Sequence, residues 1–310
     1  MIDPTKTGAS DIPTEHWLDR WIPGRARPYG RLARLDRPIG TWLLYIPCLW
    51  GVVLASPGLA GPYWIAAYFA LFGAGALVMR GAGCTFNDIV DKDYDIQVAR
   101  TRVRPIASGA ITVPRAVAFL IIQLLVGLAI LAAFNAFTIV LGVASLALVF
   151  TYPFMKRITY WPQAFLGLTF NWGVLMGYGA VTGTLAPAAI TLYGASFFWT
   201  LGYDTIYAHQ DKEDDVLVGV KSLALRLGPG TRPWLFAFYG AATVLMAVAG
   251  YLAGLHWLYY VGLGGALAQL MWQAARVDID DPDDCLAKFK SNRTFGFILL
   301  AALATGQIGF

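Results

Sequence analysis

The chain has 310 residues, of which 57% are hydrophobic and 14% charged, and its net charge is +4. Soluble globular domains carry about 25% charged residues, so this composition favours a membrane protein and excludes an ordinary soluble domain. The basic residues are spread over five membrane-proximal segments, which excludes a nucleic-acid-binding protein, and three widely spaced cysteines exclude a disulfide framework.

The first 38 residues are polar and mixed in charge, and we expect them to form a cytoplasmic segment ahead of a single membrane domain at 39–310. Long uncharged runs follow, and each is long enough, or nearly so, to cross a hydrocarbon core as a helix. The nine runs are 39–57, 62–79, 116–134, 136–155, 161–182, 187–203, 234–253, 256–274 and 294–310. The predicted fold is all-α, with nine transmembrane helices around a central cavity and cytoplasmic cap loops.

Basic residues lie on one side of this predicted bundle. All 23 lysines and arginines occur in the N-terminal segment or in the gaps after the second, fourth, sixth and eighth runs. Under the positive-inside rule these segments are cytoplasmic and the C-terminus is outside. We therefore expect a multi-pass protein, surrounded by lipid, in the cell inner (cytoplasmic) membrane.

The gap after the second run contains a first acidic segment, in which Asn87, Asp88, Asp91 and Asp95 are spaced three and four residues apart. Residues at these spacings share one face of a helix. If the second helix continues past the membrane surface, these side chains form a stripe that points into the protein.

The gap after the sixth run contains a second acidic segment with Asp204, Asp211 and Asp215, and seven residues separate the first two on one helical face. Two facing stripes of oxygen ligands predict a site for one or two Mg²⁺ ions, which bind carboxylates together with substrate phosphates. Solvated loop acids are the alternative, and this applies better to Asp283 in the acidic tract after the eighth run.

Basic residues accompany both acidic segments. Arg102 and Arg104 follow the first segment, and Lys221 follows the second. A metal ion with Arg and Lys is the usual clamp for a diphosphate. A diphosphate site beside lipid indicates a substrate with a long apolar tail, such as an isoprenyl diphosphate. Its ionisation leaves an allylic cation, which the ring of Tyr207 could stabilise.

Five motifs occur in order along the chain: Arg34 to Gly40, Asn87 to Asp95, Arg102 to Gly109, Tyr152 to Gln163 and Asp204 to Ser222. Together they resemble the motifs of the UbiA-type intramembrane aromatic prenyltransferases, and the similarity covers about residues 29–310. One departure is Leu223, where a small or hydroxyl residue is expected.

The resemblance implies a Mg²⁺-dependent transfer of a polyprenyl group from polyprenyl diphosphate to 4-hydroxybenzoate, ortho to the hydroxyl, as a membrane step of ubiquinone biosynthesis. It implies metal binding by Asn87, Asp88, Asp91, Asp95, Asp211 and Asp215. Asp91, Asp204, Tyr207 and Asp211 would be catalytic, with Asp204 positioning or deprotonating the phenol. Arg102, Arg104 and Lys221 would bind phosphate, and Arg34, Lys156 or Arg157 would bind the acceptor's carboxylate.

Other functions remain open at this point. Within the family, haem farnesylation, menaquinone synthesis and homogentisate prenylation are alternatives. A membrane cation transporter is an alternative of a different class, but it would place its acids near the midplane of broken helices. A phosphatidyl-alcohol transferase would require a glycine after the first aspartate of its motif, which this chain does not have.

Overall fold

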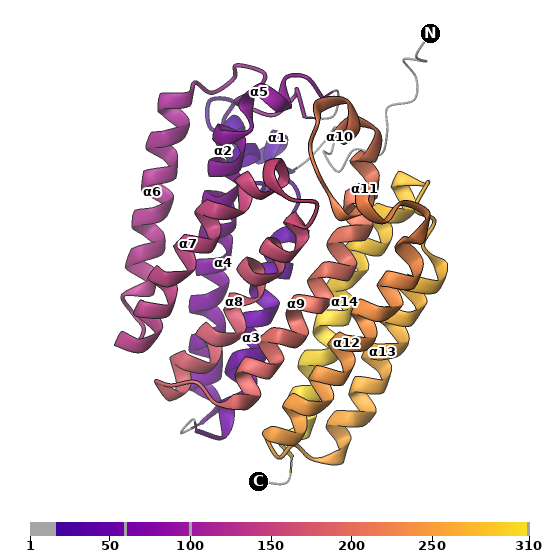
Figure 1. Ribbon diagram of the computed structural model, residues 1–310. Coiled ribbons are helices and arrows are strands. Elements are labelled where there is room, and N and C mark those ends of the chain that lie inside the picture. The colour runs from indigo at the N-terminus through magenta and orange to yellow at the C-terminus, as the bar shows by residue number, and fades with distance from the viewer. Residues whose placement is uncertain (1–16, 59–60, 99–100, 309–310) are drawn as a thin grey trace.

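The computed structural model describes residues 17–58, 61–98 and 101–308, and all regular elements in these ranges are helices. The long helices are α3 (Ile39–Leu54), α4 (Pro62–Val90), α6 (Val113–Leu131), α7 (Ala136–Ile158), α8 (Pro162–Thr182), α9 (Pro187–Ala208), α12 (Thr231–Leu252), α13 (Trp257–Arg276) and α14 (Pro282–Gly306). The short ones are α1 (Trp17–Trp21), α2 (Arg27–Leu32), η1 (Ser56–Gly58), α5 (Lys92–Asp95), η2 (His209–Asp211), α10 (Lys212–Val218), α11 (Leu223–Leu227) and η3 (Gly228–Gly230). The long helices run along one another, and α1, α2, α5, α10 and α11 gather towards one end (Figure 1).

Five helices in the described part of the chain are long and apolar enough to cross a membrane: α4, α6, α7, α8 and the stretch Leu223–Leu252. Helix α3 is apolar but has only 16 residues. Each of the nine predicted runs falls on one of the long helices. The all-helical membrane fold is therefore confirmed, whereas nine membrane crossings remain a prediction.

Two helices extend well beyond their predicted apolar runs. Helix α4 continues to Val90, eleven residues past the predicted end at 79, and α14 begins at Pro282 rather than at 294. Hydropathy marks only the part of a helix that suits lipid, and charged residues do not end a helix. The extension of α4 is important because it carries Arg80 and Asn87 to the cavity described below.

The largest buried core joins α3, α9, α12, α13 and α14, and aromatic rings of α3, α9 and α14 lie within it. The ring centres of Trp50 and Trp199 lie 5.1 Å apart, and that of Phe295 lies 5.0 Å from Trp199. Trp50 Nε1 donates to the Gly296 carbonyl at 2.9 Å, and Trp199 Nε1 donates to Asn292 Oδ1 at 2.8 Å. Both indole N–H groups are thus satisfied without water, as burial requires. This core closes the side of the bundle where α3 meets α14.

Helices α3 and α8 cross in backbone contact. A Cβ atom added at Gly51 would lie 2.2 Å from the Val174 carbonyl oxygen, and one at Gly177 would lie 2.1 Å from the Cys48 carbonyl oxygen. Only glycine fits such distances, and small residues are the usual means of bringing membrane helices together. The contact fixes α8, which forms one wall of the cavity, against α3.

Candidate active site

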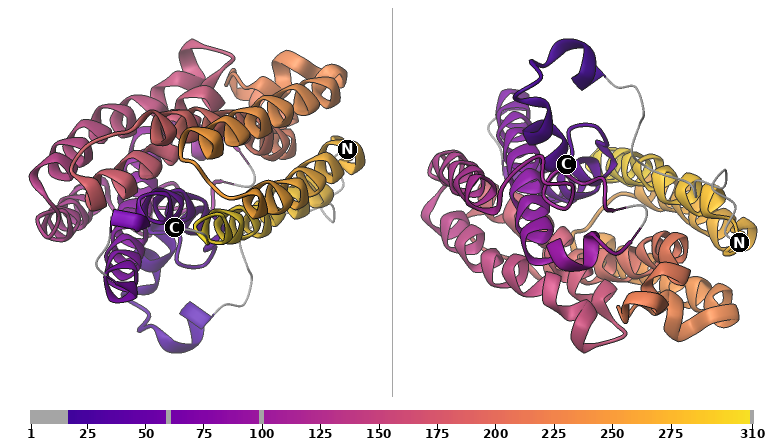
Figure 2. Two further views of the ribbon diagram at one scale, coloured as in Figure 1. Left: turned by 90° about the horizontal axis from the view of Figure 1, so that it is seen from below. Right: turned by 90° about the horizontal axis from the view of Figure 1, so that it is seen from above.

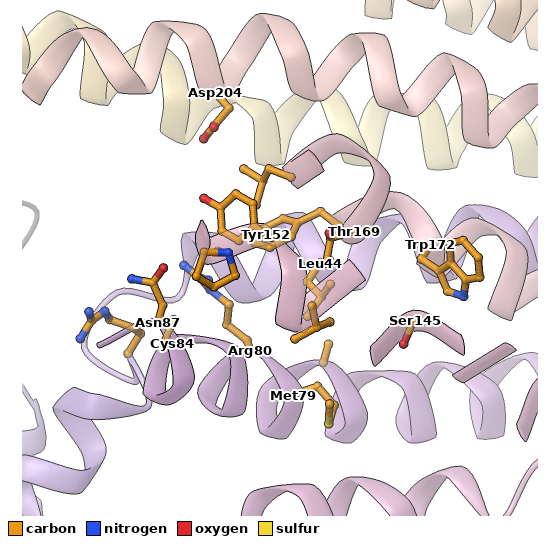
Figure 3. Close-up of a pocket in the computed structure, with 18 of the residues that line it drawn as sticks. Leu44, Met79, Arg80, Cys84, Asn87, Ser145, Tyr152, Thr169, Trp172 and Asp204 are labelled. Carbon is orange, nitrogen blue, oxygen red and sulfur yellow. The ribbon is translucent and has the colours of Figure 1, made fainter. Parts of the chain in front are cut away.

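A cavity of about 690 Å³ lies among α3, α4, α7, α8 and α9, with α6 beside it. Figure 3 shows Asn87 on α4 and Asp204 on α9 entering it from opposite sides. The predicted residues that line it are Arg34, Asn87, Asp88, Asp95, Arg104, Lys156, Asp204, Tyr207, Asp211, Asp215 and Lys221. The two acidic segments therefore border one cavity.

Helical hydrogen bonding in the first acidic segment continues across the junction between α4 and α5. The Asp91 N–H donates to the Asn87 carbonyl at 2.8 Å, and the Asp95 N–H donates to the Asp91 carbonyl at 2.8 Å. These bonds keep the four-residue spacing close to one helical face.

Arginines from two other segments neutralise Asp88 and Asp95. Arg34 Nη2 donates to both carboxylate oxygens of Asp88, at 2.7 and 2.9 Å. Arg104 Nη1 donates to Asp95 at 2.9 Å and to Asp88 at 3.3 Å. The Asp88 side chain is only 1% exposed, and a buried carboxylate requires such partners. Arg34 reaches it from a turn in which its φ is 57°, a rare value for a residue with a Cβ atom.

Asp91 lies one layer behind the cavity wall. Its side chain is fully buried, pairs with Lys156, and accepts a bond of 3.2 Å from Arg157 Nη2. Arg157 also donates to the Val90 carbonyl at 2.9 Å, and its guanidinium lies 4.8 Å from the centre of the Tyr94 ring. Lys156 lines the cavity, but Asp91 and Arg157 do not.

The second acidic segment is not the single helix that the seven-residue spacing predicted. Helix α9 ends at Ala208, η2 follows to Asp211, and α10 begins at Lys212. Asp204, Asp211 and Asp215 nevertheless all line the cavity, although they lie on three successive elements, α9, η2 and α10.

Two of the three predicted phosphate-binding residues line the cavity, and the third does not. Lys221 lines the cavity, and its Nζ donates to the Ile158 carbonyl at 3.1 Å. Its backbone N–H donates to the Lys156 carbonyl at 2.8 Å, which ties the second loop to α7. Arg104 lines the cavity, whereas Arg102 is exposed and does not.

Arg80 on α4 lines the cavity and was not predicted. Its Nε is buried without a hydrogen-bond partner among the described residues, and its guanidinium lies 5.4 Å from the centre of the Phe170 ring. The predicted second run ends at residue 79, so Arg80 is predicted to be one of the basic residues that follow a membrane helix. Its distance of seven residues from Asn87, two helical turns, could have placed both on one face.

Aromatic rings complete the cavity wall. Tyr207 lines the cavity, and its ring centre lies 4.3 Å from that of Phe289 on α14, which also lines it. Tyr152 on α7 also lines the cavity and lies near Asp204 in Figure 3. Ring faces at these positions could stabilise a cation in the cavity.

The donor atoms suit a magnesium ion that is shared with a phosphate. Among the described residues, no three acidic, histidine or cysteine side chains converge closely enough to hold an ion alone. Mg²⁺, however, is usually held by one or two carboxylates together with substrate phosphates and water. Asn87, Asp211 and Asp215 border the same cavity as Asp88 and Asp95, so the chemistry of the donors fits.

The chain matches the model of the UbiA prenyltransferase family over residues 44–300. It is 50% identical over 307 residues to a mitochondrial 4-hydroxybenzoate polyprenyltransferase of Arabidopsis thaliana, covering 98% of this chain and 75% of that protein. It is 50% identical over 287 residues to the human mitochondrial protein of the same name, covering 92% of this chain and 77% of that one.

A solved structure of a UbiA homolog from Archaeoglobus fulgidus, bound to GPP and Mg²⁺, has a similar fold. Its TM-score is 0.64 at 19% identity, and the match covers 88% of this chain and 99% of that chain. Another structure of a UbiA homolog from the same organism holds Cd²⁺. Each of these two structures therefore contains a divalent metal ion.

The comparisons correct the expected location. The two relatives are named as mitochondrial, so the expected cell inner membrane of a bacterium is wrong, and the comparison points to a mitochondrial membrane. Charge asymmetry shows which loops share a side of a membrane, but it does not identify the membrane. The family match and the identity over nearly the whole chain agree with the motifs and with the fold, and the chain belongs to the UbiA prenyltransferase family.

Proposed function

We propose that this protein transfers a polyprenyl group from a polyprenyl diphosphate to 4-hydroxybenzoate, ortho to the hydroxyl, and that the reaction depends on Mg²⁺. One observation carries the proposal: a single cavity has acidic and basic groups at one end, apolar walls at the other, and Asp204 and Arg80 on opposite sides between them (Figure 3).

The polar end suits a diphosphate. Arg104, Lys156 and Lys221 line the cavity and would bind its oxygens. Asn87, Asp88, Asp95, Asp211 and Asp215 would hold Mg²⁺, with Asp91 behind them, and the ion would neutralise the charge that develops on the departing diphosphate. Asp91 would act by holding Lys156 and Arg157 in place, since it pairs with both.

The centre of the cavity suits the aromatic acceptor. 4-Hydroxybenzoate has its hydroxyl and its carboxylate at opposite ends of one ring. Asp204 would accept a hydrogen bond from the phenol, and Arg80 would bind the carboxylate from the facing side. Arg80 is well suited to this role, because it lines the cavity on the side that faces Asp204 and its Nε has no hydrogen-bond partner among the described residues.

The reaction needs no covalent intermediate with the protein. The bond between the allylic carbon and the diphosphate oxygen breaks, and its electron pair leaves with the diphosphate. The ring carbon ortho to the hydroxyl then bonds to the allylic cation, and its proton would pass to the Asp204 carboxylate or to the released diphosphate. The ring faces of Tyr207, Tyr152 and Phe170 would shield the cation from water and stabilise it.

Purified protein in lipid nanodiscs, incubated with 4-hydroxybenzoate and geranyl diphosphate, tests the proposal. We expect prenylated 4-hydroxybenzoate by mass spectrometry, its loss with EDTA and its recovery with added Mg²⁺. Benzoate, which has no phenol to activate the ring, should give no product. Absence of product with 4-hydroxybenzoate under every condition, or full activity in EDTA, would contradict the proposal.

A further inference from the structure

The segment that leads into α11 is bonded to the ends of α7 and α8. The Lys221 N–H donates to the Lys156 carbonyl at 2.8 Å, and Lys221 Nζ donates to the Ile158 carbonyl at 3.1 Å. The Leu223 N–H donates to the side-chain oxygen Oε1 of Gln163, on α8, at 3.1 Å. These bonds keep two distant parts of the chain side by side at one end of the bundle (Figure 2).

The Leu223 N–H needs the acceptor that Gln163 supplies. Leu223 is the first residue of α11, where a backbone N–H has no partner within its own helix. Its side chain is fully buried beside Leu201 of α9, and a buried N–H without a partner is costly. The N-cap residue Ser222 bonds to the Leu225 N–H instead. The Gln163 oxygen is therefore committed to the folded loop.

This bond also fixes the orientation of the Gln163 amide. A backbone N–H can bond only to the oxygen of an amide side chain, so Oε1 faces Leu223 and the Nε2 group is left for another partner. Gln163 is 4% exposed, and it lines the cavity. Among the described residues Nε2 has no hydrogen-bond partner, yet it is not one of the side-chain atoms that the protein seals from solvent. Its two N–H donors are therefore available to a ligand in the cavity.

The surroundings of this amide belong to the polar end of the cavity. Lys156, Lys221 and Ser222 line the cavity there, and Gln163 bonds to the residue that follows Ser222. Lys156 pairs with Asp91, so part of its positive charge is already balanced. A neutral N–H donor beside these lysines can bind an anionic oxygen without disturbing that ion pair.

We propose that Gln163 is a further substrate-binding residue of the donor site, in which Oε1 fixes the loop through Leu223 and Nε2 donates to an oxygen of the diphosphate. This inference rests on the proposed function. A hydrogen bond to an ionised oxygen is about twice as strong as one between neutral groups. The same side chain thus positions the loop that carries Lys221 and binds the ligand that Lys221 binds.

Two substitutions separate the two ends of the amide. Gln163→Glu keeps an oxygen for the Leu223 N–H but removes the donor, whereas Gln163→Met, an unbranched side chain, removes both. Gln97→Glu is the matched control, because Gln97 is exposed and does not line the cavity. The KM values for geranyl diphosphate and 4-hydroxybenzoate, the Kd for magnesium pyrophosphate and the melting temperature are measured for each protein.

We expect both Gln163 variants to raise the KM for geranyl diphosphate and the Kd for magnesium pyrophosphate by at least about tenfold, as loss of a hydrogen bond to a charged group does. The KM for 4-hydroxybenzoate should stay within about twofold of wild type, and the control should match wild type throughout. Recovery of wild-type values in Gln163→Glu would overturn the inference, because the bond to Leu223 would then be the whole role of the side chain. A rise in the KM for 4-hydroxybenzoate alone would also overturn it, because Nε2 would then bind the acceptor.

Gln163→Met decides the question if the charge of Gln163→Glu prevents folding, since it introduces no charge. A rise confined to the donor and to pyrophosphate supports the inference, and unchanged values would overturn it. Failure of the proposed function has a different signature. Wild type would then give no prenylated 4-hydroxybenzoate, whereas weaker binding of magnesium pyrophosphate to Gln163→Met would still assign Nε2 to a diphosphate.

Discussion

The two acidic segments hold their carboxylates in different ways. In the first, Asp88 and Asp91 are at most 1% exposed, and each is paired with basic residues from distant parts of the chain. In the second, Asp211 and Asp215 are partly exposed and line the cavity where the helix is broken. A buried charge that loses its partner is costly, whereas a partly exposed charge is screened by solvent. Loss of a carboxylate should therefore reduce stability more in the first segment than in the second, although both segments border the cavity.

The largest expected effects separate the two segments. Asp211→Asn should lower turnover by at least about a hundredfold, as removal of a key electrostatic group does, and should cost less stability than a change in the first segment because its side chain is partly exposed. Asp91→Asn should lower turnover as much and also cost about 2 kcal/mol of stability, because Lys156 and Arg157 lose their counter-charge. Turnover and melting of the detergent-solubilised proteins provide the measurement.

Asp283→Asn is the control for both variants. Asp283 is exposed on α14 and does not line the cavity, so its loss should leave turnover and melting within error. Equal losses of activity for all three variants would remove the distinction, as would a large loss of stability for Asp211→Asn.

Arg80 also lies on α4, but its Nε has no hydrogen-bond partner in the part of the chain that the structure describes. Arg80→Met should raise the KM for 4-hydroxybenzoate by about 10–100-fold, the value of one charged hydrogen bond, with little change in the KM for the donor. 4-Hydroxybenzyl alcohol, which has no carboxylate, should bind wild type and variant equally well. A variant that still prefers 4-hydroxybenzoate over this alcohol as strongly as wild type does would assign the carboxylate to another residue.

A substitution at Gly40 tests the position of Arg80 and should have a smaller effect on the KM. A Cβ atom at Gly40 would lie 2.4 Å from Arg80 Nε, so Gly40→Ala must displace the guanidinium. We expect a rise of about fivefold in the KM for 4-hydroxybenzoate, which corresponds to roughly 1 kcal/mol of lost hydrogen bonding. Gly240→Ala on α12 is the matched control, because a Cβ atom there meets nothing within 4 Å. Equal KM values for the two variants would mean that Arg80 is not positioned by Gly40.

The smallest expected effect concerns His209, in η2 of the second segment. Burial, helped by Lys212, lowers the pKa of His209 to about 4, and its Nε2 lies 2.9 Å from Thr231 Oγ1. The unfolded chain then binds a proton that the folded protein does not, so stability should fall as the pH falls from about 6.5 towards 4. His209→Asn should reduce this slope of melting temperature against pH. An unchanged slope would show that His209 is charged in the folded protein.

The sequence was sufficient for the helices and for most of the residues around the cavity. Uncharged runs locate membrane helices because lipid tolerates little else, and Asn87, Asp88 and Asp95 were placed by their helical spacing. The spacing of Asp204 and Asp211 places both on one helical face only if the helix is unbroken. Helix α9 ends at Ala208, so this prediction was wrong.

The ion pairs were harder to predict from the sequence than the positions of residues along a helix. Nothing in the spacing shows that Arg34 would cross 54 residues to reach Asp88, or that Arg157 would face Asp91 rather than the cavity. Those contacts depend on tertiary packing. Arg80 was missed for the opposite reason, since a charge at the end of an apolar run looks like an ordinary boundary until the helix is known to continue.

The position of the charged cavity residues at the end where the short helices gather has a kinetic consequence. A water-soluble phenol can reach that end from the aqueous side, whereas a donor with a long apolar tail is dissolved in the membrane. The two substrates therefore come from different phases, and the prenylated product stays in the hydrocarbon phase.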